Sequence, residues 1–387
     1  MAAKSVQRVI ILSPAHPLRG GIASSTERLA QELQQQGSEV VILSFSLQYP
    51  KLLFPGKTQY TTDPAPNELD IRPVINSINP LNWLKVGRQL AQLQPDLIIS
   101  RFWLPFMGPA LGTILRTAKK RTPAISIGIT DNVTPHEQRP GDKALTRYYL
   151  GGCDGFIVMS KSVEEDIRKF TSLQPVAYTP HPIYDNYGPI SSRKAALQQL
   201  GLPEGQRYLL FFGFIREYKG LDLLLQAMAL PQVRSLRLQL IVAGEFYGPE
   251  APYRQMVEDL GIAEAVIFRS SYIPKEEVGL YFAAADLVVQ PYKTATQSGI
   301  SQLAFHFEKP MVVTDVGGLP EIVRHGEEGY VVPITPQAIG NAISDFYAHG
   351  READMTKAVR TGKARFDWSH MASKIREMYQ RLKTPNS

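Results

Sequence analysis

Two cations, Arg216 and Lys219, stand three positions apart directly after an apolar run that predicts a buried parallel strand. The run covers residues 208–212, Gly213 breaks it, and a helix with apolar residues at i, i+3, i+4 and i+7 follows from Leu221. Both cations therefore lie in a loop at the carboxyl end of a strand, where open α/β sheets bind ligands. A guanidinium and an ammonium that converge there suit a diphosphate, although a pair of solvated loop charges is an equal alternative from this segment alone.

A second anion-binding feature follows a later strand of the same half. Residues 286–290 predict a strand, and residues 299–307 predict a helix for which Ser298 is a typical N-cap. Gly299 allows close approach to the first backbone N–H groups, and such a helix N-terminus is an anion site. Because the two features converge, we expect phosphate binding at this edge of the sheet.

The first half of the chain contains two more candidate sites at strand ends. Gly20 and Gly21 precede a helix over residues 22–36 in a βαβ unit, but without the G-x-G-x-x-G fingerprint of nicotinamide binding. A tight turn without a ligand is an equal alternative. Asp131 and His136 follow a strand over residues 123–130, and a carboxylate and an imidazole at a strand end form a suggestive pair.

The alternation of strands and helices predicts an α/β fold with two Rossmann-like domains and a cleft between them. We place the domains at residues 1–188 and 189–366, with a final helix in 367–387 that crosses back to the first domain. Residues 47–80 predict an irregular excursion. The aromatic loop over residues 101–107 favours core packing, with an acceptor-facing or membrane-facing surface as the alternative.

Composition limits the class of protein. The chain has 387 residues, is 44% hydrophobic and 20% charged, and carries a single cysteine, Cys153, which excludes a disulfide framework and a cysteine-rich metal site. Its net charge is +6, and residues 1–188 hold 20 Lys and Arg against 15 Asp and Glu. This excess suits an anionic lipid or substrate, and the absence of a basic block argues against nucleic acid. We expect a cytoplasmic protein, because neither a signal peptide nor a membrane-spanning run is evident.

Taken together, these motifs resemble the retaining glycosyltransferases of family 4, which have the GT-B architecture. The resemblance runs from Arg8 to about Phe366. It is carried by an ordered set of short motifs: Gly20-Gly21, Asp131 through Glu137, Ser160, Arg216-x-x-Lys219-Gly220, Ala285-Asp286, Pro291-Tyr292 and Gly317-Gly318-Leu319-Pro320-Glu321.

The resemblance implies that the second domain holds a nucleotide-diphosphate sugar and the first holds the acceptor, with no metal and no cofactor. Arg216 and Lys219 would stabilise the departing diphosphate. Further roles implied in this way are approach to the donor by Gly20 and Gly21, contact with the transferring sugar by Asp131 or His136, phosphate binding by Ser298, Gly299 and Ile300, and contact with the nucleobase by Ile273.

The sequence departs from the family pattern at one place. The family carries two glutamates eight positions apart around the phosphate-site helix, and here these positions fall near Ala295 and Leu303. Gln302 is then the candidate for the ribose contact, and Gln297 for a sugar contact. The departure leaves an inactive or atypical member open.

The expected function is therefore a retaining hexosyl- or related glycosyltransferase that modifies a glycan or lipid-linked acceptor in cell-envelope glycan synthesis. It would work in the cytoplasm, or peripherally at the inner face of an anionic membrane. The alternatives are a sugar-nucleotide epimerase of the same architecture and a non-catalytic protein that binds a sugar nucleotide or glycan.

Overall fold

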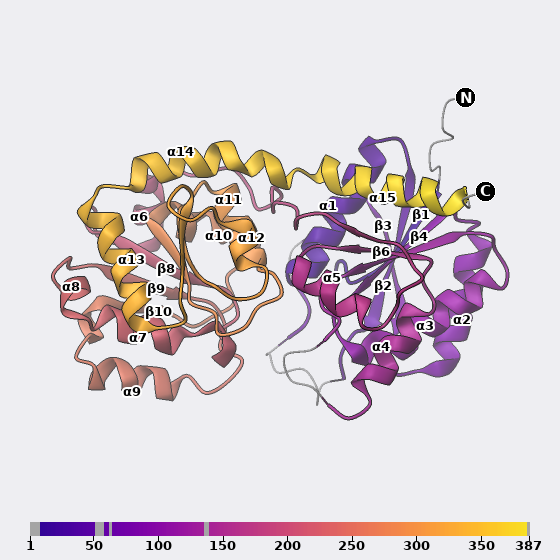
Figure 1. Ribbon diagram of the computed structural model, residues 1–387, viewed down its shortest axis with the longest axis horizontal. Helices are drawn as coiled ribbons and strands as arrows, with labels where there is room; N and C mark the ends of the chain where they lie inside the picture. The colour runs from indigo at the N-terminus through magenta and orange to yellow at the C-terminus, as the bar shows by residue number, and fades with distance from the viewer. Residues whose placement is uncertain (1–7, 51–57, 62–63, 135–138, 385–387) are drawn as a thin grey trace. The chain divides into compact units, whose positions relative to one another are not determined.

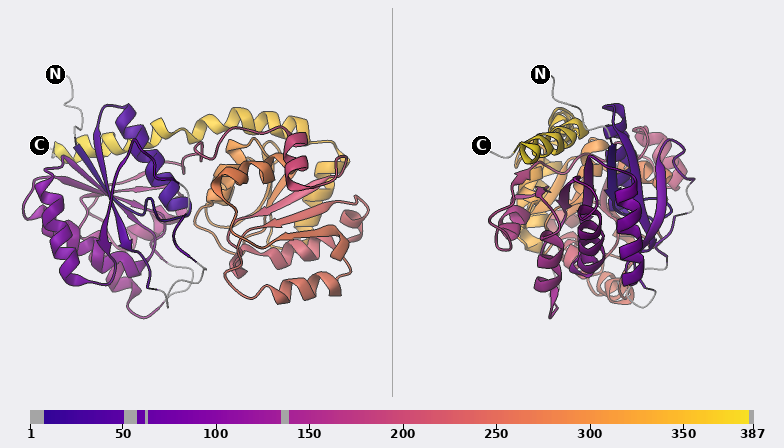
Figure 2. Two further views of the ribbon diagram at one scale, coloured as in Figure 1. Left: turned by 180° about the vertical axis from the view of Figure 1, so that it is seen from behind. Right: turned by 90° about the vertical axis from the view of Figure 1, so that its right-hand side faces the viewer.

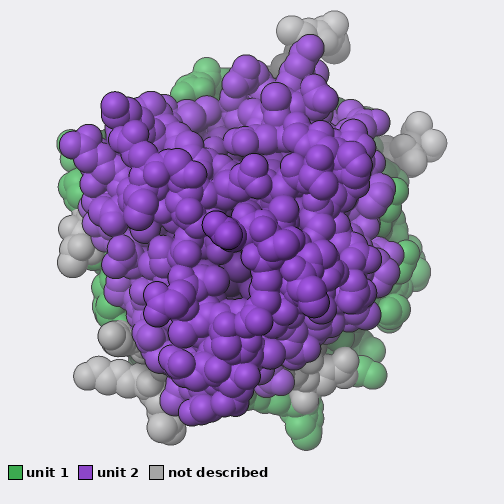
Figure 3. All heavy atoms as spheres, turned by 90° about the vertical axis from the view of Figure 1, so that its left-hand side faces the viewer, with its two compact units in different colours: residues 1–182, 367–387 green, residues 183–366 purple. Residues whose placement is uncertain are grey.

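The computed structural model describes residues 8–50, 58–61, 64–134 and 139–384, and it separates into two compact units (Figures 1 and 3). Unit 1 comprises residues 1–182 and 367–387, and unit 2 comprises residues 183–366. From the sequence we predicted the first boundary between residues 188 and 189, and a helix within residues 367–387 that returns to the first domain.

Unit 1 is built on a parallel sheet of seven strands in the order β3-β2-β1-β4-β5-β6-β7. Its central strands are almost wholly buried, as expected for strands that are covered on both faces. The strands are β1 (Arg8–Leu12), β2 (Glu39–Leu47), β3 (Asp70–Asn76), β4 (Leu97–Phe102), β5 (Ile125–Thr130), β6 (Gly155–Val158) and β7 (Val176–Tyr178).

Helices lie on both sides of this sheet (Figure 2). The last helix of the chain belongs to this unit, since it contacts α1, β5 and β6 and buries Trp368, Met371 and Ile375. The helices are α1 (Gly21–Gln35), α2 (Pro80–Gln92), α3 (Gly108–Lys119), α4 (Asp142–Leu150), α5 (Lys161–Arg168) and α15 (Trp368–Lys383).

Unit 2 repeats the pattern with six parallel strands in the order β10-β9-β8-β11-β12-β13. These are β8 (Tyr208–Phe212), β9 (Gln239–Ala243), β10 (Val266–Arg269), β11 (Leu287–Gln290), β12 (Met311–Thr314) and β13 (Gly329–Val332). Its helices are α6 (Arg193–Leu200), α7 (Leu221–Met228), α8 (Pro231–Arg234), α9 (Ala251–Asp259), α10 (Lys275–Ala284), α11 (Gly299–His306), α12 (Leu319–Ile322), α13 (Pro336–Ala348) and α14 (Glu352–Gly362). Two Rossmann-like α/β units of this kind confirm the predicted fold class.

Each sheet reverses its strand order at one point, and open α/β sheets bind ligands at the carboxyl ends of the strands beside such a reversal. In unit 1 the reversal lies between β1 and β4, and in unit 2 it lies between β8 and β11. The loops after β8 and β11 are the two segments in which the sequence predicted anion binding. The topology therefore brings those two segments to adjacent strand ends.

The prediction of an irregular segment over residues 47–80 was wrong for its last part. Residues Asp70–Asn76 form β3, which pairs in parallel with β2 at the edge of the sheet. The strand was missed because Pro73 interrupts it and its charged residues Asp70 and Arg72 are exposed and paired with each other. An edge position tolerates both features.

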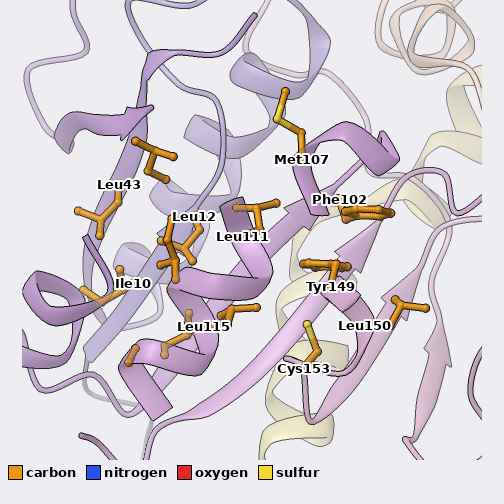
Figure 4. Packing of buried hydrophobic residues seen from close by; sticks show 14 of the residues in the cluster. Ile10, Leu12, Leu43, Phe102, Met107, Leu111, Leu115, Tyr149, Leu150 and Cys153 are labelled. Atoms are coloured by element: carbon orange, nitrogen blue, oxygen red, sulfur yellow. The ribbon is translucent and has the colours of Figure 1, made fainter. Parts of the chain in front are cut away.

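The aromatic loop after β4 packs into the core of unit 1, which confirms the favoured prediction. The Phe102 ring stacks on Tyr149 with centroids 4.2 Å apart, and Met107 is fully buried nearby (Figure 4). Trp103 is partly buried and donates a hydrogen bond from Nε1 to the Tyr49 hydroxyl at 2.6 Å. This loop therefore does not form an exposed acceptor-facing or membrane-facing surface. None of the described helices is long and apolar enough to span a bilayer.

Candidate active site

The loop after β8 holds Lys219 in a fixed place beside the loop after β11. Gly213 (φ 98°) and Gly220 (φ 70°) allow the turns on either side of a short 3-10 helix over Glu217–Lys219. A Cβ on Gly220 would collide with the carbonyl oxygen of Pro291, so only glycine permits this approach. The Lys293 N–H donates to the Tyr218 carbonyl at 2.7 Å, which ties the two loops together.

Lys219 is a buried cation without an acidic partner. The residue is 9% exposed, and no carboxylate of the described chain lies within ion-pair distance of its ammonium group. Burial, and then the charge of Arg216, lower the pKa of Lys219 to about 7. A cation held in this way favours the arrival of an anion.

The Lys219 ammonium lies close to the first turn of α11. A Cβ placed on Gly213 would be 3.3 Å from Lys219 Nζ and 3.0 Å from Ile300 Cδ1, so both side chains meet at the same glycine. Nζ is also 5.6 Å from the centroid of the Tyr292 ring. The structure thus brings Lys219 and Ile300, two of the predicted site residues, close together.

The N-terminus of α11 is organised by a buried glutamine that the sequence analysis missed. Ser298 caps the helix, accepting from the Ser301 N–H at 3.4 Å, and its hydroxyl donates to Gln290 Oε1 at 2.8 Å. The Ser301 hydroxyl donates to the same oxygen at 3.0 Å. The N–H groups of Gly299 and Ile300 have no acceptor in the described part of the chain, so the helix presents them to an incoming anion.

Gly299 has a packing role besides the one predicted. A Cβ at this position would lie 2.8 Å from Cε2 of Tyr184, so the tyrosine ring needs a glycine here. The Gly317-Gly318 turn also supports the loop before α11. Gly317 (φ 50°) packs so closely on the Ala295 carbonyl that a Cβ would collide, and the Gly318 N–H donates to the Thr296 carbonyl at 3.1 Å.

Arg216 is exposed and lies next to an aromatic cluster. Its guanidinium carbon is 4.9 Å from the centroid of Tyr247, and the Tyr247 ring contacts Phe214 at 4.5 Å between centroids. Phe214 also stacks on Tyr272 at 6.4 Å. Ile273, the predicted nucleobase contact, follows Tyr272 and is 7% exposed.

Gln297 and Gln302 occupy different surroundings. Gln297 is half-buried in the loop before Ser298. Gln302 is fully buried, and neither atom of its amide has a hydrogen-bond partner among the described residues. Leu303, at the position of the second family glutamate, is buried as well. A contact between Gln302 and a ligand would require the residues that cover it to move.

In unit 1, the glycine loop lies at the N-terminus of α1. Gly20 (φ 112°) is the N-cap residue of this helix, and a Cβ at Gly20 would meet no atom within 4 Å. Gly21 is exposed. Since the loop follows β1, these glycines lie at the strand ends where unit 1 reverses its order.

Asp131 lies at the same edge and forms a buried ion pair with Arg101. Arg101 Nε donates to Asp131 Oδ2 and Nη2 donates to Oδ1, both at 2.7 Å, in a bidentate arrangement. Arg101 Nη1 also donates to the Ser25 hydroxyl of α1. Arg101 and Asp131 are 5% and 9% exposed, so the pair links the ends of β4 and β5 to the helix of the glycine loop within the protein interior.

His181 lies next to this pair and is neutral at physiological pH. Its Nδ1 donates to the Pro182 carbonyl at 2.7 Å, which leaves Nε2 unprotonated. Burial, and then the charge of Arg101, lower the pKa of His181 to about 4. Sequence reasoning missed Arg101 and His181, although a single cation at the end of the apolar strand over residues 97–102 was a usable signal. His136, the other predicted catalytic residue of this half, lies outside the described residues.

Comparisons with known proteins place both halves in one family. Residues 19–186 match the model of Glycosyltransferase Family 4, and residues 192–362 match the model of Glycosyl transferases group 1. A protein named D-inositol 3-phosphate glycosyltransferase from Streptomyces avermitilis is 27% identical over 73% of this chain. The match spans 65% of the length of that relative.

Solved structures agree on the fold. Sucrose-phosphate synthase from Thermosynechococcus elongatus matches with a TM-score of 0.75 at 19% identity, over 97% of this chain and 99% of the other. Anabaena HepE in complex with UDP and glucose matches with a TM-score of 0.72 at 17% identity, over the same shares. The chain belongs to family 4 of the glycosyltransferases and has the two Rossmann-like domains of the GT-B fold.

Replacement of either partner of the Arg101–Asp131 pair should destabilise unit 1. Asp131→Asn or Arg101→Met should each lower the free energy of unfolding by about 3–5 kcal/mol, because the remaining charge is left buried. The double variant should lose less than the sum of the two. All three tryptophans, Trp83, Trp103 and Trp368, lie in unit 1, so tryptophan fluorescence during urea unfolding reports on this unit. Additive losses would contradict the pairing.

Removal of the unpaired amide of Gln302 should stabilise unit 2. Gln302→Met keeps the unbranched shape and removes two unsatisfied polar atoms, so the free energy of unfolding should rise by about 1–3 kcal/mol. Ser301→Ala is the matched control and should lower it, because the Ser301 hydroxyl is hydrogen-bonded. Differential scanning calorimetry without ligand compares the three proteins. A loss of stability in Gln302→Met would show that the amide has a partner in the folded protein.

Proposed function

We propose that this protein is a retaining, metal-independent glycosyltransferase that moves a sugar from a nucleotide-diphosphate sugar to a glycan or lipid-linked acceptor. The observation that carries the proposal is the buried, unpaired ammonium of Lys219 beside the free N–H groups of α11, at the strand reversal of unit 2. A diphosphate bound there would neutralise the cation and accept from the helix N-terminus.

In this proposal the leaving diphosphate gains negative charge as the bond from its oxygen to the anomeric carbon breaks. Lys219 and Arg216 stabilise that growing charge, which lowers the barrier because the interaction is stronger in the transition state than in the ground state. Both cations are already in place, so the proposal assigns no metal and no cofactor to the site. Ser298, Gly299 and Ile300 bind phosphate oxygen, Ile273 contacts the nucleobase and Gln297 contacts the sugar. Gln302 contacts the ribose once the residues that cover it have moved.

Unit 1 supplies the remaining proposed contacts. Gly20 and Gly21 approach the donor through their backbone N–H groups at the start of α1. Both oxygens of Asp131 accept from Arg101, so this carboxylate is a poor general base. Between the two predicted residues, this observation favours His136 for contact with the transferring sugar and a positioning role for Asp131.

The relatives suggest which substrates to assay first. The HepE structure contains UDP and glucose, so UDP-glucose is the first donor to test. The name of the Streptomyces relative makes inositol 3-phosphate the first soluble acceptor, next to lipid-linked sugars. We place the reaction in cell-envelope glycan synthesis in the cytoplasm, and the excess positive charge of residues 1–188 supports peripheral contact with an anionic membrane.

Nucleotide release separates the proposed function from its alternatives. A transferase releases nucleoside diphosphate only when an acceptor is present, whereas an epimerase converts the donor without releasing it and a binding protein does neither. An epimerase also needs an acid and base pair near the sugar carbon, and the engagement of Asp131 by Arg101 argues against that role.

Substitution of either cation at the diphosphate site should lower turnover. Arg216→Ala or Lys219→Ala should reduce acceptor-dependent nucleotide release by roughly 10²–10³-fold, the effect of losing one preorganised charge contact. Lys357→Ala removes an exposed cation elsewhere in unit 2 and should keep the wild-type rate. The thermal midpoint of Lys219→Ala without ligand should not fall, because the wild-type ammonium is buried without a partner. Near wild-type turnover in both variants would rule out the phosphate assignment.

Nucleotide binding should be linked to protonation of Lys219. Its pKa in the folded protein, about 7, lies below its ordinary value, so the group is largely neutral above pH 8. A bound diphosphate favours the charged form, so binding above about pH 8 should take up close to one proton and weaken by as much as tenfold per pH unit.

Titration calorimetry in two buffers of different ionisation enthalpy measures this proton uptake. Lys219→Arg is the matched control, because arginine keeps the charge and does not titrate in this range. Its nucleotide affinity should stay constant between pH 7 and 9. The same proton uptake in the wild type and in Lys219→Arg would assign the linkage to another group.

A further inference from the structure

The exposed face of α2 carries an unusual concentration of apolar side chains. Three of the eight large hydrophobic residues that are exposed in the described chain lie within seven positions, namely Ile78 (50% exposed), Leu81 (79%) and Leu84 (40%). Leu81 and Leu84 lie three residues apart on one side of the first turns of α2, and Ile78 comes directly before Asn79, the N-cap residue of this helix. The opposite side of the helix is buried through Val86 and Leu90, so α2 is already held in the fold.

The same exposed face of α2 also carries two cations. Lys85 and Arg88 follow Leu81 and Leu84 at helical spacing, and both are exposed. Neither has an acidic partner among the residues that the structure describes, and residues 78–92 contain no Asp or Glu. An apolar group flanked by unpaired cations and free of acidic residues suits the boundary between lipid headgroups and acyl chains.

The position of this face in unit 1 also bears on its role. The α2 helix starts directly after the carboxyl end of β3, and all strands of this sheet are parallel. The apolar residues at its N-terminus therefore lie at the same edge of the sheet as Gly20, Gly21 and Asp131. A membrane at this face would hold a lipid-linked acceptor next to the carboxyl edge of the unit 1 sheet. This is the edge at which we expect unit 1 to bind its acceptor.

We propose that the α2 face, defined by Ile78, Leu81, Leu84, Lys85 and Arg88, docks on an anionic phospholipid bilayer. The apolar side chains enter the interface and the two cations pair with lipid phosphates. A second copy of this chain is the less suitable occupant, because a self-complementary contact would bring the Lys85 and Arg88 charges of both copies together. The proposal rests on the membrane contact that the proposed function includes, and it gives that contact a location.

Vesicle sedimentation tests the proposal with the 387-residue chain. Binding to vesicles of phosphatidylcholine and phosphatidylglycerol should exceed binding to pure phosphatidylcholine and should weaken with salt, by about fivefold for each cation whose contribution is lost. Leu81→Glu with Leu84→Glu should reduce binding at least about tenfold. Lys85→Glu with Arg88→Glu should remove the preference for the anionic lipid.

Matched controls come from elsewhere on the surface. Leu173 is 93% exposed but isolated near the β7 edge of the sheet, so Leu173→Glu should bind vesicles like the wild type. Lys357→Glu, in unit 2, is the control for a charge reversal. A tryptophan introduced as Leu81→Trp should shift its emission to the blue with anionic vesicles and be quenched by brominated lipid, whereas Leu173→Trp should not.

Three results would overturn the proposal. The first is that the wild-type protein does not bind anionic vesicles. The second is that the Leu81→Glu, Leu84→Glu variant binds them as well as the wild type does. The third is a dimer in light scattering that Leu81→Glu dissociates, since the face would then join two copies of the chain. Turnover with a soluble acceptor should be unchanged in the α2 variants, so a failure of membrane docking is distinguishable from a failure of the proposed transferase activity.

Discussion

The site in unit 2 depends on a lysine ammonium that is buried without a carboxylate. Removing a cation from water is costly, and Lys219 meets that cost partly by a pKa lowered to about 7. Most buried charges in proteins are paired, so an unpaired one at a strand reversal is a site prepared for an anion. The unpaired ammonium of Lys219 therefore destabilises the protein without ligand, and a bound anion removes this destabilisation.

The surrounding loops keep Lys219 in place through backbone contacts so close that no side chain fits at Gly220 or Gly317. Gly220 lies against Pro291, and Gly317 lies against Ala295, so the three loops of unit 2 support one another through backbone contacts. Gln290 then fixes the N-terminus of α11 by accepting from two serine hydroxyls. In unit 1 the Arg101–Asp131 pair has the comparable role, because it joins two strand ends to α1.

Much of this architecture is predictable from sequence because buried parallel strands read as continuous apolar runs and their helices as amphipathic ones. The loops after β8 and β11 were predicted for the same reason, since each joins a strand and a helix with clear sequence patterns. The β3 strand was missed because an edge strand tolerates Pro73 and exposed charges. The Arg101–Asp131 pair was missed because it joins residues thirty positions apart, and no local pattern reports which distant charges meet.

The function proposed for unit 2 requires that it recognise the diphosphate of a nucleotide sugar through Lys219 and the start of α11. A thermal-shift comparison of nucleoside diphosphates with the corresponding nucleosides tests it most directly, because a ligand that binds the folded state raises the unfolding midpoint. We expect that one nucleoside diphosphate raises the midpoint of the wild type, that its nucleoside does not, and that Lys219→Met abolishes the shift. Equal shifts by the nucleoside and its diphosphate, or no shift by any diphosphate, would contradict it.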